Sequence, residues 1–175
     1  MLRDANWHDA QAICQIYNPY IAHTTITFEE YPVRPMDIER RIRDVQERAL
    51  PWLVWEDQGH IVAYAYVRPW QTRSAYRYTV ESSVYVDQQF TGKGIGRRIY
   101  GELLRRVDTM GIHAVVGCVA MPNEPSVLLH QKLGFQRVGC FPEVGRKFDR
   151  WIDVEYWQMI FEGGIPGDQF AEKST

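Results

Sequence analysis

The sequence has few cysteines, and their placement argues against a disulfide framework and against a zinc site. Only Cys14, Cys118 and Cys140 occur among the 175 residues, without a CxxC pair and without histidine at the spacing of a zinc ligand set. An odd, sparse set of this kind is typical of reduced, buried thiols in a reducing compartment. We therefore expect no metal site and a cytoplasmic location.

Long hydrophobic runs and an excess of positive charge are also missing. The longest apolar stretches fall far short of the ~20 residues of a transmembrane helix. The opening MLRDANWHDA carries charges instead of the apolar run of a signal peptide. The 20 Lys and Arg residues against 22 Asp and Glu leave a net charge of −2. We therefore expect neither a membrane partner nor a nucleic-acid partner.

The residues that are present indicate one packed domain of the α+β class. Hydrophobic residues make up 45% of the chain and aromatic residues 13%, and a domain commonly has about 150 residues. Periodicity and turn signals predict strands at 2–5, 52–56, 61–68, 76–86, 114–119, 135–143 and 151–161, and helices at 7–20, 35–48, 94–110 and 126–133. This order predicts one mixed sheet of about seven strands, its last hairpin turning around Gly145, and a flexible tail at 162–175.

The most specific motif is a glycine-rich loop between a strand and a helix. Residues 89–98 read QFTGKGIGRR, so three alternating glycines open the helix, with Lys93 and Arg97 beside them. Glycines let main-chain N–H groups approach a ligand closely, and a helix N-terminus adds unpaired N–H groups and a partial positive charge. The loop therefore predicts a phosphate site, the alternative being a glycine-rich turn without a ligand.

The glycine spacing excludes two common phosphate loops. A Walker loop reads GxxxxGK[ST] and a dinucleotide-binding turn reads GxGxxG, whereas this loop reads GxGxG.

Two motifs resemble those of the GNAT family of N-acetyltransferases. Gln89-x-x-Gly92-x-Gly94 is similar to the Q/R-x-x-G-x-G/A motif with which the family binds the pyrophosphate of acetyl-CoA, and residues 123–135 resemble its N-x-x-A-x-x-L-Y-x-x-x-G-F stretch. The resemblance implies acetyl-CoA as co-substrate, a domain over 1–161, helices on both sheet faces, and a sheet splayed between its fourth and fifth main strands. It implies as cofactor-binding residues Val84, Tyr85, Val86, Gly92, Lys93, Gly94, Ile95, Gly96, Arg97, Asn123 and Ser126, although Ser126 could instead cap its helix.

Two further stretches narrow the resemblance to phosphinothricin acetyltransferases. They read YAYVRPWQTRSAYRYTVESSVYV over 64–86 and TITFE over 25–29. That subfamily acetylates the α-amino group of analogues such as phosphinothricin, methionine sulfoximine and methionine sulfone by direct attack on the thioester, which links it to antibiotic or herbicide resistance. The resemblance implies a homodimer and the substrate-binding residues Phe28, Arg73, Ser74, Ala75 and Glu81.

Acetyl transfer to an amine requires a base, and Glu81 is the candidate. A free α-amino group has a pKa of about 7.7–8.0, so at neutral pH most of it carries a proton that must be removed. A carboxylate inside a strand between Val and Tyr is out of place for packing, although an ion-paired surface Glu is the alternative. His130 is the candidate acid for the leaving thiolate, although the family often has Tyr there and a lone His is commonly packed. Arg73, or else Arg77, is the candidate for the substrate carboxylate.

Two other functions stay open on sequence alone. One is an acetyltransferase for protein N-termini or other small amines, and the other is a non-catalytic module that binds acetyl-CoA. The presence of Glu81 argues against the non-catalytic module.

Overall fold

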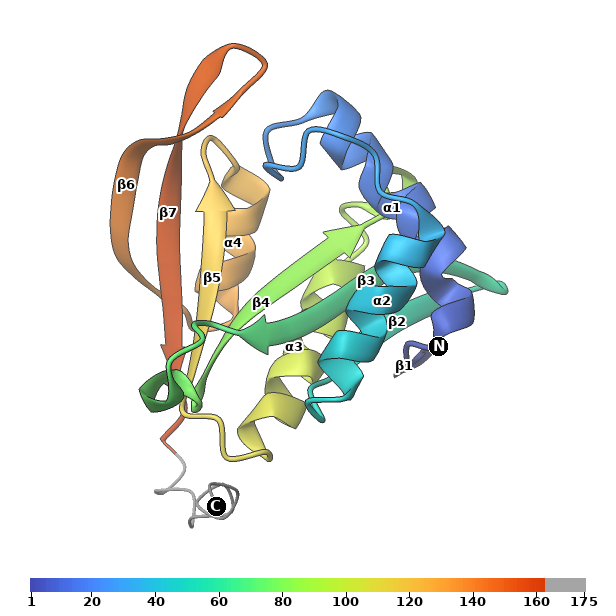
Figure 1. The fold of residues 1–175 in the computed structure, drawn as a ribbon, viewed down its shortest axis with the longest axis horizontal. Helices are drawn as coiled ribbons and strands as arrows, with labels where there is room; N and C mark the ends of the chain where they lie inside the picture. Colours follow the sequence, from blue (N-terminus) through green and yellow to red (C-terminus); the bar gives the residue numbers. More distant parts are fainter. Residues whose placement is uncertain (163–175) are drawn as a thin grey trace.

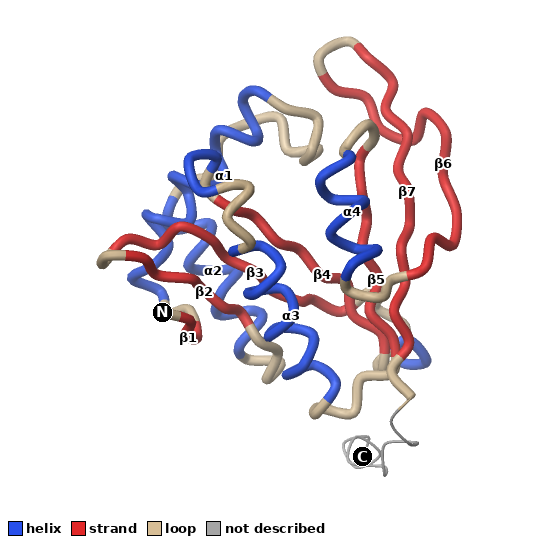
Figure 2. The backbone as a smooth tube through the Cα atoms, turned by 180° about the vertical axis from the view of Figure 1, so that it is seen from behind, coloured by secondary structure: helices blue, strands red, loops and turns tan. Residues whose placement is uncertain are grey.

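The computed structural model describes residues 1–162 and confirms the predicted order of elements and the α+β class. A seven-stranded sheet in the order β1-β2-β3-β4-β5-β7-β6 has helices on both faces (Figures 1 and 2). The strands are β1 Leu2–Asp4, β2 Trp52–Asp57, β3 His60–Pro69, β4 Thr79–Val86, β5 Ala114–Ala120, β6 Gln136–Lys147 and β7 Arg150–Ile160. The helices are α1 Ala10–His23, α2 Pro35–Gln46, α3 Ile95–Asp108 and α4 Glu124–Lys132.

The expected tail lies, from residue 163 onward, outside the described residues. Within residues 1–162, no helix is both long enough and apolar enough to cross a membrane.

Each face of the sheet carries its own hydrophobic core. Helices α1 and α2 cover one face, and α3 and α4 lie on the other (Figures 1 and 2). Successive side chains of a strand point to opposite faces, so in β2 Trp52 and Val54 pack in the α1–α2 core whereas Leu53 packs in the α3 core. Helix α3 contributes an apolar stripe that includes Ile99 and Leu103, both fully buried.

Strands β4 and β5 form the parallel pair of the sheet and separate beyond four paired positions. The pairing runs from Thr79 with Ala114 to Ser82 with Gly117. Strand β4 then continues to Val86 and β5 to Ala120, so their carboxyl ends diverge, as Figure 1 shows. The splay expected between the fourth and fifth main strands is therefore confirmed. Ligands of open α/β sheets bind at such carboxyl ends.

Three predicted boundaries are wrong. Helix α1 runs past Pro19 to His23, because its buried face continues through Ile21. Strand β4 begins at Thr79, since residues 74–76 form a short 3-10 helix. The β6–β7 turn lies at Phe148 and Asp149, whose φ angles of 50° and 57° are those that a two-residue hairpin turn requires.

Candidate active site

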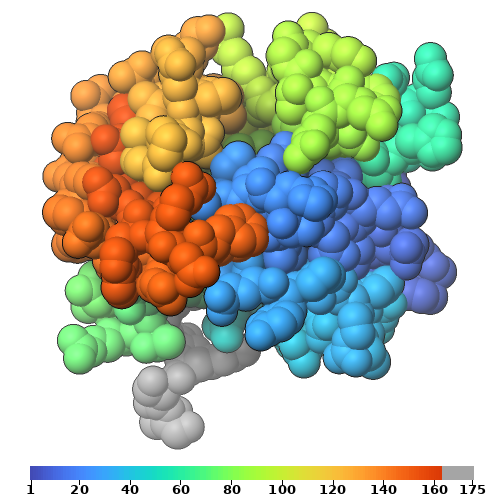
Figure 3. Space-filling model, turned by 90° about the horizontal axis from the view of Figure 1, so that it is seen from above, coloured from blue at the N-terminus to red at the C-terminus, as the bar shows by residue number. Residues whose placement is uncertain are grey.

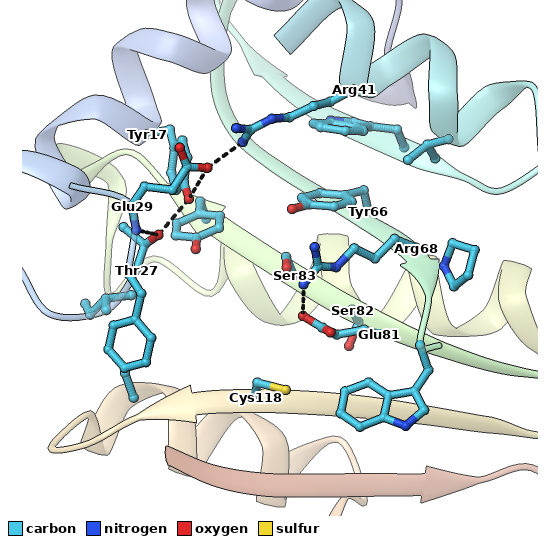
Figure 4. Close-up of a pocket in the computed structure, with 18 of the residues that line it drawn as sticks. Tyr17, Thr27, Glu29, Arg41, Tyr66, Arg68, Glu81, Ser82, Ser83 and Cys118 are labelled. Carbon is cyan, nitrogen blue, oxygen red and sulfur yellow. Dashed lines mark hydrogen bonds and ion pairs between the residues drawn. The ribbon is translucent and has the colours of Figure 1, made fainter. Parts of the chain in front are cut away.

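A cavity of about 1100 Å³ opens on the α1–α2 face, over the point at which β4 and β5 separate (Figure 4). Its walls come from the α1–α2 loop, from both of these helices, and from strands β2 to β7. The lining residues labelled in Figure 4 are Tyr17, Thr27, Glu29, Arg41, Tyr66, Arg68, Glu81, Ser82, Ser83 and Cys118. Phe28 and Trp70 also line the cavity.

Glu81 points into this cavity from β4 and pairs with Arg68 of β3. The two residues face each other in the strand register, and Arg68 Nη2 donates a hydrogen bond to Glu81 Oε1 at 2.7 Å. Burial lowers the pKa of Arg68, but the neighbouring Glu81 carboxylate outweighs this effect and leaves that pKa above its usual value. The Glu81 side chain is 15% exposed. The guanidinium thus fixes one carboxylate oxygen, while Oε2 has no hydrogen-bond partner within residues 1–162.

Cys118 of β5 lies across the cavity from this ion pair (Figure 4). Cys118 is exposed at the cavity surface, so the expectation of a buried thiol is wrong for this residue. Partial desolvation by the cavity walls, followed by the charge of Glu81, raises the pKa of its thiol to about 12. Cys118 is therefore a neutral thiol at physiological pH. Its place in the site was not predicted, because a single cysteine in an apolar strand has no distinguishing pattern.

The predicted substrate contacts Arg73, Ser74 and Ala75 do not line the cavity. They lie in and just before the exposed 3-10 turn that precedes β4. Arg77 is also exposed, and it donates to the Ser74 carbonyl at 3.2 Å. The cation next to Glu81 is instead Arg68. Sequence reasoning missed it because its alignment with Glu81 depends on the register across a long β3–β4 connection.

His130 is packed inside the fold, in surroundings that do not favour its predicted role as an acid. His130 is 5% exposed and lies in the α3–α4 layer, with Nδ1 2.8 Å from the Ser126 carbonyl and Nε2 3.2 Å from the Tyr100 hydroxyl. Nδ1 therefore donates and Nε2 accepts. A Cβ at Gly117 would overlap the imidazole, so the ring is packed tightly against β5. Burial lowers the pKa of His130, which leaves it neutral at pH 7 and a poor proton donor.

The glycine-rich loop lies on the opposite face of the sheet, at the N-terminus of α3. Gly92 and Gly94 have φ angles of +74° and +76°, a conformation that favours glycine. Gly94 is the N-cap of α3, so the N–H groups that follow it have no intrahelical acceptor. Side chains at Gly92 or Gly94 would enter open space. The loop fits a diphosphate, because it combines these N–H groups with the positive end of the helix and with Lys93 and Arg97.

The end of β4 offers main-chain groups to the opening. Trp70 N donates to Thr79 O at 3.2 Å and Asp87 N donates to Val62 O at 2.8 Å. In an antiparallel pair such bonds alternate, so Val84 and Val86 direct their N–H and C=O groups away from β3 and toward the gap. Tyr20 Oη donates to the Val86 carbonyl at 2.6 Å, which leaves the main chain of Val84 and the Val86 N–H facing the gap.

Tyr85 does not fit its predicted role in cofactor binding. Its side chain lines the cavity on the α1–α2 face, and its ring lies 4.8 Å from that of Tyr17 and 5.3 Å from that of Tyr64. By the same alternation, its main chain bonds to β3. Tyr85 therefore belongs to the wall of the cavity.

Asn123 and Ser126 lie at the start of α4, on the other side of the β4–β5 opening (Figure 2). Asn123 is the N-cap, and its Oδ1 accepts the Ser126 N–H at 3.3 Å. Ser126 therefore does not cap this helix, contrary to one sequence-based alternative. The amide nitrogen of Asn123 still has donors for a ligand in the opening.

The family model, the two relatives and the solved structure that follow all match this chain and are all described as acetyltransferases. The family described as "Acetyltransferase (GNAT) domain" matches residues 2–156. The chain is 38% identical over 165 residues to a phosphinothricin N-acetyltransferase of Streptomyces viridochromogenes, covering 94% of this chain and 90% of that protein. It is 35% identical over 161 residues to an L-methionine sulfoximine/L-methionine sulfone acetyltransferase of Salmonella typhimurium, covering 90% and 92%. The structure of a GNAT superfamily phosphinothricin acetyltransferase from Sinorhizobium meliloti, in complex with AcCoA, matches with a TM-score of 0.89 and 31% identity, covering 93% and 89%.

Proposed function

Because the chain belongs to the GNAT family of acetyltransferases, we propose that it acetylates the α-amino group of a small amino acid or amino-acid analogue with acetyl-CoA. The observation that carries this proposal is the Arg68–Glu81 pair, which places a carboxylate with a free oxygen where β4 and β5 separate. Relatives that act on phosphinothricin, methionine sulfoximine and methionine sulfone support a substrate of this size and type.

Acetyl-CoA supplies an acetyl group activated as a thioester. The N–H groups that follow Gly94, together with Lys93 and Arg97, are the groups that would hold its diphosphate. The main chain of Val84 and the Val86 N–H, with the Asn123 amide across the gap, would hold the arm that passes between the strands. These residues fit acetyl-CoA, because the space around Gly92 and Gly94 is open and the N–H groups at the start of α3 have no intrahelical acceptor.

Glu81 would act as the general base. The carboxylate removes the proton of the substrate ammonium, directly or through one water, because only the neutral amine is a nucleophile. Arg68 holds the carboxylate in place through its 2.7 Å hydrogen bond, which limits the rotamers that the base must sample.

Arg68 would also bind the substrate carboxylate. The ammonium and carboxylate of an α-amino acid are attached to one carbon, so they fit a site with one negative and one positive group side by side. Arg68 uses one of its nitrogens for Glu81, and a guanidinium offers five N–H donors. The remaining donors face the cavity beside the base. This arrangement favours an amino acid with a free carboxylate over one whose carboxylate is converted to an amide.

A thiol-release assay with acetyl-CoA tests the function. Methionine sulfone, methionine sulfoximine and phosphinothricin should release CoA faster than methionine amide or a short peptide. Fastest release with the peptide would instead favour acetylation of protein N-termini, and no release with any amine would overturn the proposal.

We also propose that the protein is a cytoplasmic homodimer. Its three cysteines are free, in keeping with a reducing compartment. The β6–β7 hairpin exposes Phe141, Phe148 and Trp151, with exposed fractions of 56%, 51% and 60%, and such a group of exposed aromatic side chains suits a protein interface.

A further inference from the structure

We propose that Gly145 of β6 positions the ring of Phe28, and that this contact sets which substrate side chains the cavity accepts. The inference rests on the proposed function, which it extends to a specificity-determining pair of residues. Phe28 and Val144 both line the cavity, and Gly145 contacts the Phe28 ring, so a change at residue 145 would reach the cavity wall through that ring.

The end of the β6–β7 hairpin contacts the α1–α2 loop. Figure 3 shows this hairpin end, in orange-red, against the blue segment that follows α1. Lys147 Nζ donates to the Thr27 carbonyl at 2.8 Å, and Lys147 is 3% exposed. On the other side, the hydroxyls of Tyr17 and Thr27 are 2.7 Å apart. Thr27, the residue directly before Phe28, is therefore held through its carbonyl by the buried Lys147 and through its side chain by Tyr17.

The ring of Phe28 occupies the space that a side chain at residue 145 would need. A Cβ built on Gly145 would overlap Cε2 and Cζ of Phe28 and would lie 3.0 Å from Cδ2. The φ angle of Gly145 is outside the left-handed region, so its backbone conformation does not require glycine. Contact with the ring therefore accounts for the missing side chain.

An added methyl group would displace the ring more readily than the loop. Thr27 is held on two sides, whereas the Phe28 ring turns about two single bonds and is 41% exposed. We therefore expect Gly145→Ala to fold normally and to move the Phe28 ring, thereby changing the shape of the cavity. Gly139→Ala is the matched control, because it lies on the same strand and a Cβ there would meet nothing within 4 Å.

Fluorine NMR of the full-length protein labelled with fluorophenylalanine tests the positioning. Phe28→Leu assigns the Phe28 resonance. Gly145→Ala should shift that resonance, and Gly139→Ala should leave it in place. An unchanged Phe28 resonance in Gly145→Ala would overturn the inference whatever the activity.

Selectivity kinetics test the second half of the inference. The ratio of kcat/KM for methionine sulfone to that for alanine should change by about tenfold in Gly145→Ala, mainly through KM, the order expected when a pocket wall shifts by one methyl group. The KM for acetyl-CoA should not change, and Gly145→Ala should have no added effect in a Phe28→Leu background. An unchanged ratio with a shifted resonance would overturn the specificity role.

The two proposals fail in different ways. A wild-type enzyme that acetylates no amino acid would defeat the proposed function. The dissociation constants of methionine sulfone and alanine, titrated into the CoA-loaded protein and followed by the Phe28 resonance, would then decide the inference. If Gly145→Ala changed the two dissociation constants by the same factor relative to the wild type, or if neither amino acid bound, the inference would be overturned.

Discussion

At the residue scale, the carboxylate of Glu81 is the group on which catalysis should depend most. Glu81→Gln keeps the size of the side chain but cannot take a proton. We expect kcat/KM to fall by about 10²–10⁴ at pH 7, the usual range for a lost acid–base group, with the dissociation constant of acetyl-CoA unchanged. The loss should shrink toward pH 9, where a substrate amine of pKa about 7.7–8.0 is already neutral. An unchanged rate at pH 7 would exclude Glu81 as the base.

Arg68 gives a second prediction at this scale. Arg68→Gln should raise KM for methionine sulfone by about 10–100-fold, as expected for the loss of charged hydrogen bonds, and should affect its amide much less. Arg73→Gln serves as the comparison, because that residue lies outside the cavity. Equal losses in kcat for acid and amide would show that Arg68 only positions Glu81, and a larger effect of Arg73→Gln would restore the sequence-based hypothesis.

The buried His130 should make the free energy of unfolding of the protein depend on pH. Burial holds its folded-state pKa below the usual value of about 6.5, so the unfolded chain binds more protons as pH falls through about 6.5, and the wild type loses stability there. His130→Asn should lower the free energy of unfolding at pH 7.5 by about 1–3 kcal/mol, through its lost hydrogen bonds. That difference should narrow at pH 5.5. Urea unfolding at the two pH values measures it, and a difference that widens on acidification would contradict the neutral, packed imidazole.

At the scale of elements, we expect cofactor binding to depend on the N-terminus of α3. Gly94→Val places a β-branched side chain at φ +76°, which costs about 1–3 kcal/mol, and puts that side chain into the space a diphosphate would occupy. Calorimetry with CoA should detect no binding, while circular dichroism shows a folded protein. Gly59→Val is a matched control, because Gly59 has a φ of +81° and open space around it but lies in the β2–β3 turn. Normal CoA affinity in Gly94→Val would contradict the assignment.

The elements themselves were largely predictable, and the side-chain neighbourhoods were not. Periodicity predicted the seven strands and four helices, because burial of one face imposes a spacing on each element. The glycine loop was recognisable because its function depends on local backbone conformation. Arg68 was not, because its pairing with Glu81 depends on the register of β3 against β4, which are joined by a nine-residue connection. The surroundings of His130 were not predictable either, because only the tertiary fold shows that Gly117 and Tyr100 enclose it.

At the scale of the whole molecule, the exposed hairpin predicts association. Light scattering should give a mass of about twice the 20.5 kDa of one chain. Trp151→Asp should lower that mass toward the mass of one chain, because a charged side chain is disfavoured in the buried centre of an interface. The variant should stay folded, because Trp151 is 60% exposed in the single chain. A single-chain mass for the wild type would exclude the dimer.

The β4–β5 gap also has a kinetic consequence. In the proposed reaction the amine would reach Glu81 from the α1–α2 side, where the cavity opens, whereas the diphosphate would bind at the N-terminus of α3, on the other side of the same sheet. The two substrates would therefore enter by separate routes, and neither would have to leave before the other arrives. A ternary complex can form without any acetylated protein species, so initial-velocity plots at several fixed concentrations of one substrate should intersect instead of running parallel.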